Sequence, residues 1–286
     1  KMPKKYSYSR ISTFEQCPLK FKFKYIDQIK PEIEKSIEAH LGKSVHNTLE
    51  WLYSEIKNKK IPSIDETIVF YSQDWEKDYT PEKMIINSSP QNQFNKGITF
   101  LLQYYTENQP FDDNTLEVEK YITLELDEKG EYKIQGFIDR LTYNLATNEY
   151  EIHDYKTANS PPSRDKLKKD RQLALYAIAI KNAFGNEKEV SLIWHFLAHN
   201  QKIRIKTTNQ ELENTKHETL EIVKRIEASE NFPPNKSKLC DWCEYKSICP
   251  AWENKPLKME SQESLDKYPA VKKYIKDYEE NEKKNS

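Results

Sequence analysis

Three neighbouring segments of this chain have the sequence pattern of β-strands. Residues 116–126, 132–143 and 149–156 are rich in β-branched and aromatic residues and are separated by short stretches containing Asp, Gly and Asn, as in strands joined by turns. A helical pattern follows over 165–184, and two more strand-like segments lie within 189–207. This order predicts an α/β fold in which helices flank a central mixed β-sheet.

Helices are also expected before and after this strand-rich region. Apolar residues recur at helical spacing over 40–58, and a second helical pattern covers 209–229. Near the N-terminus, residues 12–15 (STFE) form a capping box, which predicts that a short helix begins there. The segment 20–26 (KFKFKYI) alternates like a strand, but Pro18 would also suit the first turn of a helix, so both structures remain open.

Charge and hydropathy limit the partners of the protein. The 286 residues carry a net charge of −1, so any nucleic-acid binding must come from local patches. Lys and Arg recur at 20–25, 164–171 and 202–206, in the first case between aromatic residues; each stretch could equally be a solvated surface. No apolar run could span a bilayer and no apolar segment follows the basic N-terminus, which predicts a cytoplasmic protein without a membrane partner.

The segment 150–157 (YEIHDYKT) places an acid and a base two residues apart in a strand. Because side chains alternate along a strand, Asp154 and Lys156 project from the same face. Fourteen residues separate Asp139 from Asp154, which suits two neighbouring strands and could bring these carboxylates together. Two carboxylates at close range repel each other unless a cation lies between them.

Mg²⁺ or Mn²⁺ would meet that need, because these hard ions prefer oxygen ligands. Asp139, Asp154 and the carbonyl of Tyr155 could supply them, while Lys156 could orient a water molecule and stabilise charge developing on a phosphate. The alternative is an ordinary salt bridge between Asp154 and Lys156, and the strand pattern alone does not exclude it.

The four cysteines form a second candidate site. Cys240, Cys243 and Cys249 have the spacing C-x2-C-x5-C, and Cys17 lies far away near the N-terminus. One four-thiolate site would use all of them. Zinc is one possible occupant, but structural zinc sites commonly use two local cysteine pairs, whereas a triplet with one distant cysteine is better suited to a [4Fe–4S] cluster.

The order of these motifs resembles the RecB-like branch of the PD-(D/E)XK nucleases, specifically its iron–sulfur group with AddB-type nuclease domains and CRISPR-adaptation exonucleases. The resemblance covers residues 7–252 and depends on the following residues, in chain order: Cys17, His46, Asp139, Asp154, Lys156, Gln172, Tyr176, Cys240, Cys243 and Cys249. Many members carry glutamate at the position of Asp154. Aspartate is the shorter acid, so the geometry of the bound metal could differ from that in those members.

The resemblance implies a restriction-endonuclease-like core and roles for these residues. His46, Asp139 and Asp154 would bind the divalent metal, Lys156 would be catalytic, and Gln172 and Tyr176 would border the active site on one helix. The cysteines would hold a [4Fe–4S] cluster that joins both ends of the chain. From the sequence alone, a lone histidine on a helix such as His46 is more often a packed or surface residue than a metal ligand, and Gln172 and Tyr176 could make structural hydrogen bonds.

The resulting hypothesis is a metal-dependent DNA exonuclease that prefers single-stranded ends and acts in DNA repair, recombination or CRISPR adaptation, possible partners being a helicase or an integrase subunit. Two alternatives remain: a weakly catalytic DNA-binding subunit of such a complex, and a zinc-stabilised nuclease acting on RNA. The expected organisation is an N-terminal part of the iron–sulfur subdomain (1–30), a helical region (31–115), the nuclease core (116–230), the C-terminal part of the iron–sulfur subdomain (231–254) and a charged tail (255–286).

Overall fold

The computed structural model describes residues 4–158 and 161–252. The chain divides into two compact units. Within the described residues, the first unit comprises 4–8, 36–81 and 86–227, and the second comprises 9–35, 82–85 and 228–252. The expected charged tail, 255–286, lies outside the described residues.

The first unit contains a six-stranded mixed sheet in the order β1-β5-β6-β7-β8, with β4 paired to β5. Its strands are β1 (Lys4–Tyr6), β4 (Thr115–Glu125), β5 (Tyr132–Asn144), β6 (Glu149–Lys156), β7 (Glu189–Phe196) and β8 (Gln201–Lys206). The β4–β5, β5–β6 and β7–β8 pairs are antiparallel, and the β1–β5 and β6–β7 pairs are parallel. The expected α/β fold with a mixed central sheet is therefore confirmed.

The central strands are the most apolar ones. In β7 every residue after Glu189 is buried, and in β6 only Tyr150 and Lys156 are partly exposed, as expected for strands covered on both faces. A parallel pair requires a crossover connection, and α6 (Arg164–Lys168) and α7 (Arg171–Phe184) provide it between β6 and β7. Helix α7 contacts β4, β5, β6 and β7.

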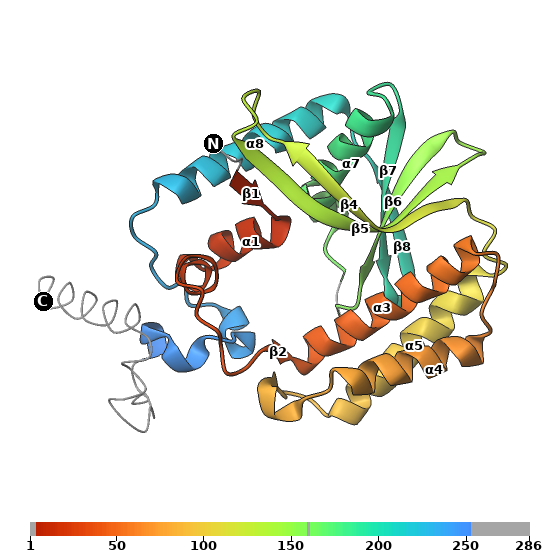
Figure 1. Ribbon diagram of the computed structural model, residues 1–286, viewed down its shortest axis with the longest axis horizontal. Helices are drawn as coiled ribbons and strands as arrows, with labels where there is room; N and C mark the ends of the chain where they lie inside the picture. Colours follow the sequence, from red (N-terminus) through yellow and green to blue (C-terminus); the bar gives the residue numbers. More distant parts are fainter. Residues whose placement is uncertain (1–3, 159–160, 253–286) are drawn as a thin grey trace, which may run out of the picture. The chain divides into compact units, whose positions relative to one another are not determined.

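The first unit also contains a group of three long helices: α3 (Ile37–Lys57), α4 (Ile64–Lys77) and α5 (Pro90–Asn108). Each begins after a serine whose hydroxyl accepts a backbone N–H of the first turn, at Ser36, Ser63 and Ser89. The helices pack against one another, and α3 also contacts β4 and β5 (Figure 1). Helix α8 (Asn209–Ala228) follows β8. None of the helices in the described residues is long and apolar enough to cross a membrane.

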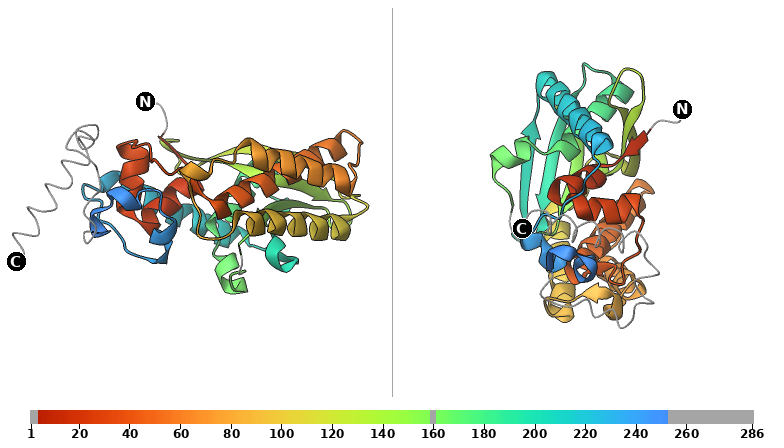
Figure 2. Two further views of the ribbon diagram at one scale, coloured as in Figure 1. Left: turned by 90° about the horizontal axis from the view of Figure 1, so that it is seen from below. Right: turned by 90° about the vertical axis from the view of Figure 1, so that its left-hand side faces the viewer.

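Short elements make up the second unit. They are α1 (Tyr8–Gln16, whose first residue belongs to the first unit), α2 (Pro18–Phe21), the π-helix η1 (Lys22–Ile26), and the 3₁₀ turns η4 (Lys238–Trp242), η5 (Lys246–Ile248) and η6 (Pro250–Trp252). The N-terminal helices and the cysteine-containing segment lie side by side (Figures 1 and 2). Leu19, Phe23, Ile29 and Tyr245 form their common apolar cluster. The other short elements of the described chain, which are not confined to the second unit, are β2 (Lys35–Ser36), η2 (Pro81–Lys83), β3 (Met84–Ile85) and η3 (Leu197–His199).

Two details of the sequence prediction are wrong. The first helix begins at Tyr8 and not at the capping box of 12–15; Ser12 lies inside this helix, where its hydroxyl accepts a hydrogen bond from the Gln16 side chain. The helix expected over 165–184 is divided at Asp170, whose extended backbone and side chain cap α7. The open question at 20–26 is resolved in favour of helix, with Pro18 at its first position.

Candidate active site

The Asp139 carboxylate takes the place of a backbone acceptor where β5 and β6 separate. The ladder between these strands ends at the pair Arg140–His153. Beyond it, the Tyr155 amide donates to Oδ2 of Asp139 at 3.0 Å. The first predicted acid is therefore bonded directly to the backbone between Asp154 and Lys156.

His46 reaches the same point from helix α3. Its Nε2 atom donates to the Tyr155 carbonyl at 2.8 Å, and its Nδ1 atom lies 3.4 Å from Oδ2 of Asp139. Burial disfavours the charged imidazolium, but the hydrogen bond to Asp139 and the charges of Asp139 and Asp154 outweigh burial and raise the pKa of His46 to about 9. The structure thus brings His46, Asp139 and the Tyr155 carbonyl together.

Asp154 and Lys156 project together, as strand alternation predicts. Lys156 Nζ lies 3.0 Å from Oδ1 and 2.8 Å from Oδ2 of Asp154. The carboxylate is 95% buried, and its Oδ2 receives no well-directed hydrogen bond. Burial raises the pKa of Asp154 to about 6, with Lys156 acting against this shift and Asp139 acting with it. The Asp154 side chain is the buried acid of the site, and an ammonium group faces it.

Helix α7 supplies the other two predicted residues. Gln172 is a hydrogen-bond partner of the Tyr176 hydroxyl, and the pKa of Tyr176 is raised by burial and by the nearby charges of Asp154 and Asp139. Gly136 on β5 permits this position, because a Cβ atom there would lie 2.3 Å from Tyr176 Oη. Tyr176 therefore lies near both acids, and Gln172, on the same face of the helix, bonds to its hydroxyl.

Two further carboxylates lie near Asp139 and are absent from the sequence-based set. Glu50 is one turn after His46 on α3, and its pKa is raised by burial and by Asp139. Glu119 is on β4, where the neighbouring pairs Val118–Arg140 and Lys120–Ile138 place it opposite Asp139. Burial, Asp139 and Glu50 raise the pKa of Glu119 to about 7. The spacing to His46 could have identified Glu50, but nothing in the sequence marks Glu119.

The donor set suits a hard divalent cation. In the described part of the chain, no three His, Cys, Asp or Glu side chains are arranged closely enough to hold a metal ion. The imidazole and the ammonium group instead neutralise the two acids. The carboxylate oxygens, the imidazole nitrogen and the backbone carbonyl nevertheless include the oxygen donors that Mg²⁺ and Mn²⁺ prefer, and Asp154 Oδ2 receives no well-directed hydrogen bond although Lys156 faces it. These residues therefore fit a divalent cation chemically.

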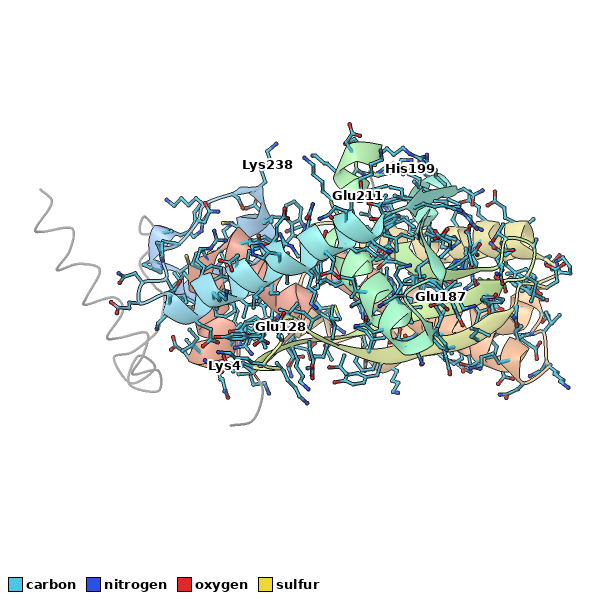
Figure 3. The ribbon with its side chains drawn as sticks, turned by 90° about the horizontal axis from the view of Figure 1, so that it is seen from above. Lys4, Glu128, Glu187, His199, Glu211 and Lys238 are labelled. Atoms are coloured by element: carbon cyan, nitrogen blue, oxygen red, sulfur yellow. The ribbon has the colours of Figure 1, made fainter. Side chains whose placement is uncertain are left out.

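The four cysteines line one pocket of the second unit. Burial and, to a smaller extent, charge on the other three sulfurs raise the pKa of the Cys249 thiol to about 11. Backbone amides face two of the sulfurs: Asn235 N lies 3.5 Å from Cys17 Sγ, and Ser237 N lies 3.4 Å from Cys240 Sγ. Such N–H groups stabilise thiolates bound to a metal. Lys238, in the same segment, projects away from its ribbon (Figure 3).

Comparisons with known proteins give one family match. A family model described as the PD-(D/E)XK nuclease superfamily matches residues 5–250. Two solved structures are similar: SSO0001, with 15% identity over 88% of both chains and a TM-score of 0.42, and a Eubacterium rectale protein named as a candidate exonuclease, with 12% identity over 82% of this chain and 85% of that chain and a TM-score of 0.48. No curated protein matches the chain.

Proposed function

The chain belongs to the PD-(D/E)XK nuclease superfamily, and we propose that this nuclease is a divalent-metal-dependent DNA exonuclease that prefers single-stranded ends. The observation that carries the proposal is the convergence of Asp139, Asp154, Lys156 and His46 around the Tyr155 backbone. Two acids, an imidazole and an ammonium group at one point supply metal ligands and a positive charge that can stabilise the phosphate during phosphodiester hydrolysis.

Each side chain has a defined role in this proposal. Asp139, Asp154, His46 and the Tyr155 carbonyl would hold Mg²⁺ or Mn²⁺, which would supply activation of a water molecule and stabilisation of charge on the phosphate. Lys156 orients the attacking water and offsets negative charge on the phosphate oxygens. Gln172 and Tyr176 contact the substrate from α7.

The basic groups of the first unit support a nucleic-acid substrate. Arg164, Lys202 and Arg204 line one polar pocket together with Pro161 and Pro162. Arg204 is paired with Glu149 and Glu151, so it contributes less free positive charge than the sequence stretch indicates. Phosphate binding by such groups would be weakened by salt. The proposed setting is cytoplasmic DNA repair, recombination or CRISPR adaptation, with a helicase or integrase subunit as partner.

The proposal includes a [4Fe–4S] cluster at Cys17, Cys240, Cys243 and Cys249. All four residues line one pocket, and amide groups are directed at two of the sulfurs. Zinc remains the alternative, because four thiolates also suit it. Either occupant would connect the N-terminal and C-terminal parts of the second unit.

The decisive experiment is digestion of end-labelled single-stranded DNA, double-stranded DNA and matched RNA in Mn²⁺, Mg²⁺ or chelator. We expect metal-dependent shortening of single-stranded DNA from an end. Asp154→Asn and Lys156→Ala should lower the rate by a factor of about 10² or more while DNA binding is retained. Asp65→Asn and Lys77→Ala remove matched charges from exposed positions of α4 and should cleave like the wild type.

Other results would select an alternative. DNA binding without digestion under any metal condition would favour a weakly catalytic DNA-holding subunit. Preferential digestion of RNA would favour the RNA nuclease. Neither binding nor digestion of any of these substrates would contradict the proposed function altogether.

A further inference from the structure

The backbone and the side chain of Tyr155 bind different partners. Its amide and carbonyl contact Asp139 and His46, as described above. Its hydroxyl accepts a hydrogen bond from Arg140 Nε at 2.9 Å and lies 3.1 Å from the Tyr104 hydroxyl of α5. The ring is 97% buried. One residue therefore connects the proposed metal ligands with a buried polar cluster.

Arg140 is the centre of that cluster and is 99% buried. Besides Tyr155, its guanidinium donates to the carboxylate of Asp113, to Thr115 Oγ1 at 3.2 Å and to His153 Nδ1 at 3.1 Å. It also lies 4.0 Å from the ring centre of Tyr53. A buried cation is costly unless it is paired and hydrogen-bonded, and these contacts meet that requirement.

The geometry of a guanidinium makes it a precise support for the Tyr155 hydroxyl. Its donors are fixed in one plane, so contacts to Asp113, Thr115 and His153 also fix the direction of Nε. Tyr104 is held in turn, because its hydroxyl lies 2.8 Å from that of Tyr53. Asp139 precedes Arg140 in the strand and its carboxylate bonds to the Tyr155 amide, so both residues constrain Tyr155 from different sides.

We propose that Arg140 and Tyr104 are positioning residues, which hold the Tyr155 hydroxyl and thereby fix the Tyr155 amide and carbonyl against Asp139 and His46. This inference rests on the proposed function, because it concerns the same metal site. Neither side chain contacts the reacting atoms. Their effect passes through the Tyr155 backbone, where a displacement of about 1 Å can lower a catalytic rate by a factor of about 10².

The test compares Tyr155→Phe and Tyr104→Phe with Tyr105→Phe. Each change removes one hydroxyl and keeps the ring. Tyr105 is the matched control, because it is a buried residue of the same helix whose hydroxyl donates to the Pro62 carbonyl at 2.8 Å and is outside the cluster. Each variant is studied well below its own melting temperature, so that loss of stability alone does not change the result.

Two measurements are made on each protein: calorimetric titration with Mn²⁺ alone, and single-strand cleavage as a function of DNA and Mn²⁺ concentration. For Tyr155→Phe and Tyr104→Phe we expect Mn²⁺ affinity to fall about 3- to 10-fold and kcat at least tenfold, with KM for DNA within twofold of the wild type. Tyr105→Phe should match the wild type in both. Arg140→Lys should resemble Tyr155→Phe if it folds.

The outcomes separate this inference from the proposed function. Wild-type Mn²⁺ affinity and kcat in both Tyr155→Phe and Tyr104→Phe would overturn the positioning role while leaving the nuclease proposal intact. A wild-type protein that binds Mn²⁺ but cleaves nothing would contradict the nuclease proposal, and the calorimetric comparison would still decide the positioning role. Absence of Mn²⁺ binding by the wild type would overturn both.

Discussion

The Tyr155 amide donates a hydrogen bond to the Asp139 carboxylate across β5 and β6, with 3.0 Å between nitrogen and oxygen. An acid proposed to bind metal therefore also completes the backbone hydrogen bonding of the sheet. Because a buried N–H without a partner is costly, removal of this carboxylate affects folding as well as chemistry. Asp139→Asn, which keeps an oxygen acceptor, is consequently a better probe of catalysis than Asp139→Ala.

Gly136→Ala should lower nuclease activity, although the added methyl group does not contact the proposed metal ligands. The added methyl group would lie 2.3 Å from Tyr176 Oη and 2.8 Å from two of its ring carbons, so the Tyr176 ring must move from its position beside the acids. We expect at least a tenfold loss of kcat with Mn²⁺ affinity within twofold of the wild type. Thr123→Ala, at an exposed position of β4, is the control. Full activity in Gly136→Ala would show that Tyr176 need not occupy this position.

Gly97→Ala should destabilise the packing of the three long helices. A Cβ atom at Gly97 would lie 2.0 Å from Tyr71 Oη and 3.0 Å from Leu41 Cδ1, and Tyr71 is fully buried. Overpacking of this kind costs about 1–3 kcal/mol, measurable by urea denaturation. Asn95→Ala, exposed on the same helix, should leave stability unchanged or slightly raised. Equal stability of Gly97→Ala and the wild type would contradict the close packing.

Glu149 should make stability depend on pH in the acid range. Burial acts to raise its pKa, but hydrogen bonds and charge from Lys206, Ser191 and Arg204 outweigh burial and hold the pKa below 4.5. The unfolded chain therefore binds this proton more readily, so the stabilisation is present above about pH 4.5 and is lost as the pH falls through the lower folded-state pKa.

The measurement for Glu149 is urea denaturation of the wild type and Glu149→Gln between pH 3 and 7. The variant should be roughly 1–3 kcal/mol less stable at pH 7, and the difference should shrink towards pH 3. Glu213→Gln, exposed on α8, should follow the wild type. A difference between Glu149→Gln and the wild type that stays constant with pH would exclude the charge as its cause.

Cys17→Ser should remove the bound cofactor as effectively as Cys249→Ser, although the residues are far apart in sequence. Anaerobically purified wild type is expected to be brown with about four iron atoms per chain, and both variants should lose colour, iron and thermal stability. Lys238→Ser, at an exposed position two residues before Cys240 and outside the residues that line the cysteine pocket, should retain them. Colourless wild type containing zinc would select the alternative metal, and metal-free wild type would exclude both.

The sheet and the proximity of the acids could be predicted because they depend on local patterns. Alternation placed Asp154 and Lys156 together, and the spacing to Asp139 suited neighbouring strands. The bond from the Tyr155 amide to Asp139 could not be predicted in this way, since it depends on where the β5–β6 ladder ends.

The place of Glu119 near Asp139 and the helical structure of KFKFKYI could not be predicted from local sequence patterns either. Glu119 has φ of 45°, a left-handed conformation that non-glycine residues seldom adopt in a strand, and its place opposite Asp139 follows from strand register. The alternation of KFKFKYI suggests a strand, but Asp27 N bonds to Lys22 O at 2.9 Å and the apolar side chains of Leu19 and Phe23 contribute to the cluster of the second unit.

The double use of the Asp139 carboxylate affects how large mutational screens should be interpreted. A screen that records only protein abundance in cells should already penalise most substitutions at this position, because the Tyr155 amide loses its acceptor. Intolerance to substitution at Asp139 would therefore be due partly to impaired folding and not only to lost catalysis. Lys156, which bonds to a neighbouring side chain instead of to the backbone, should tolerate replacement better than Asp139 in that screen and show its largest loss when cleavage is selected.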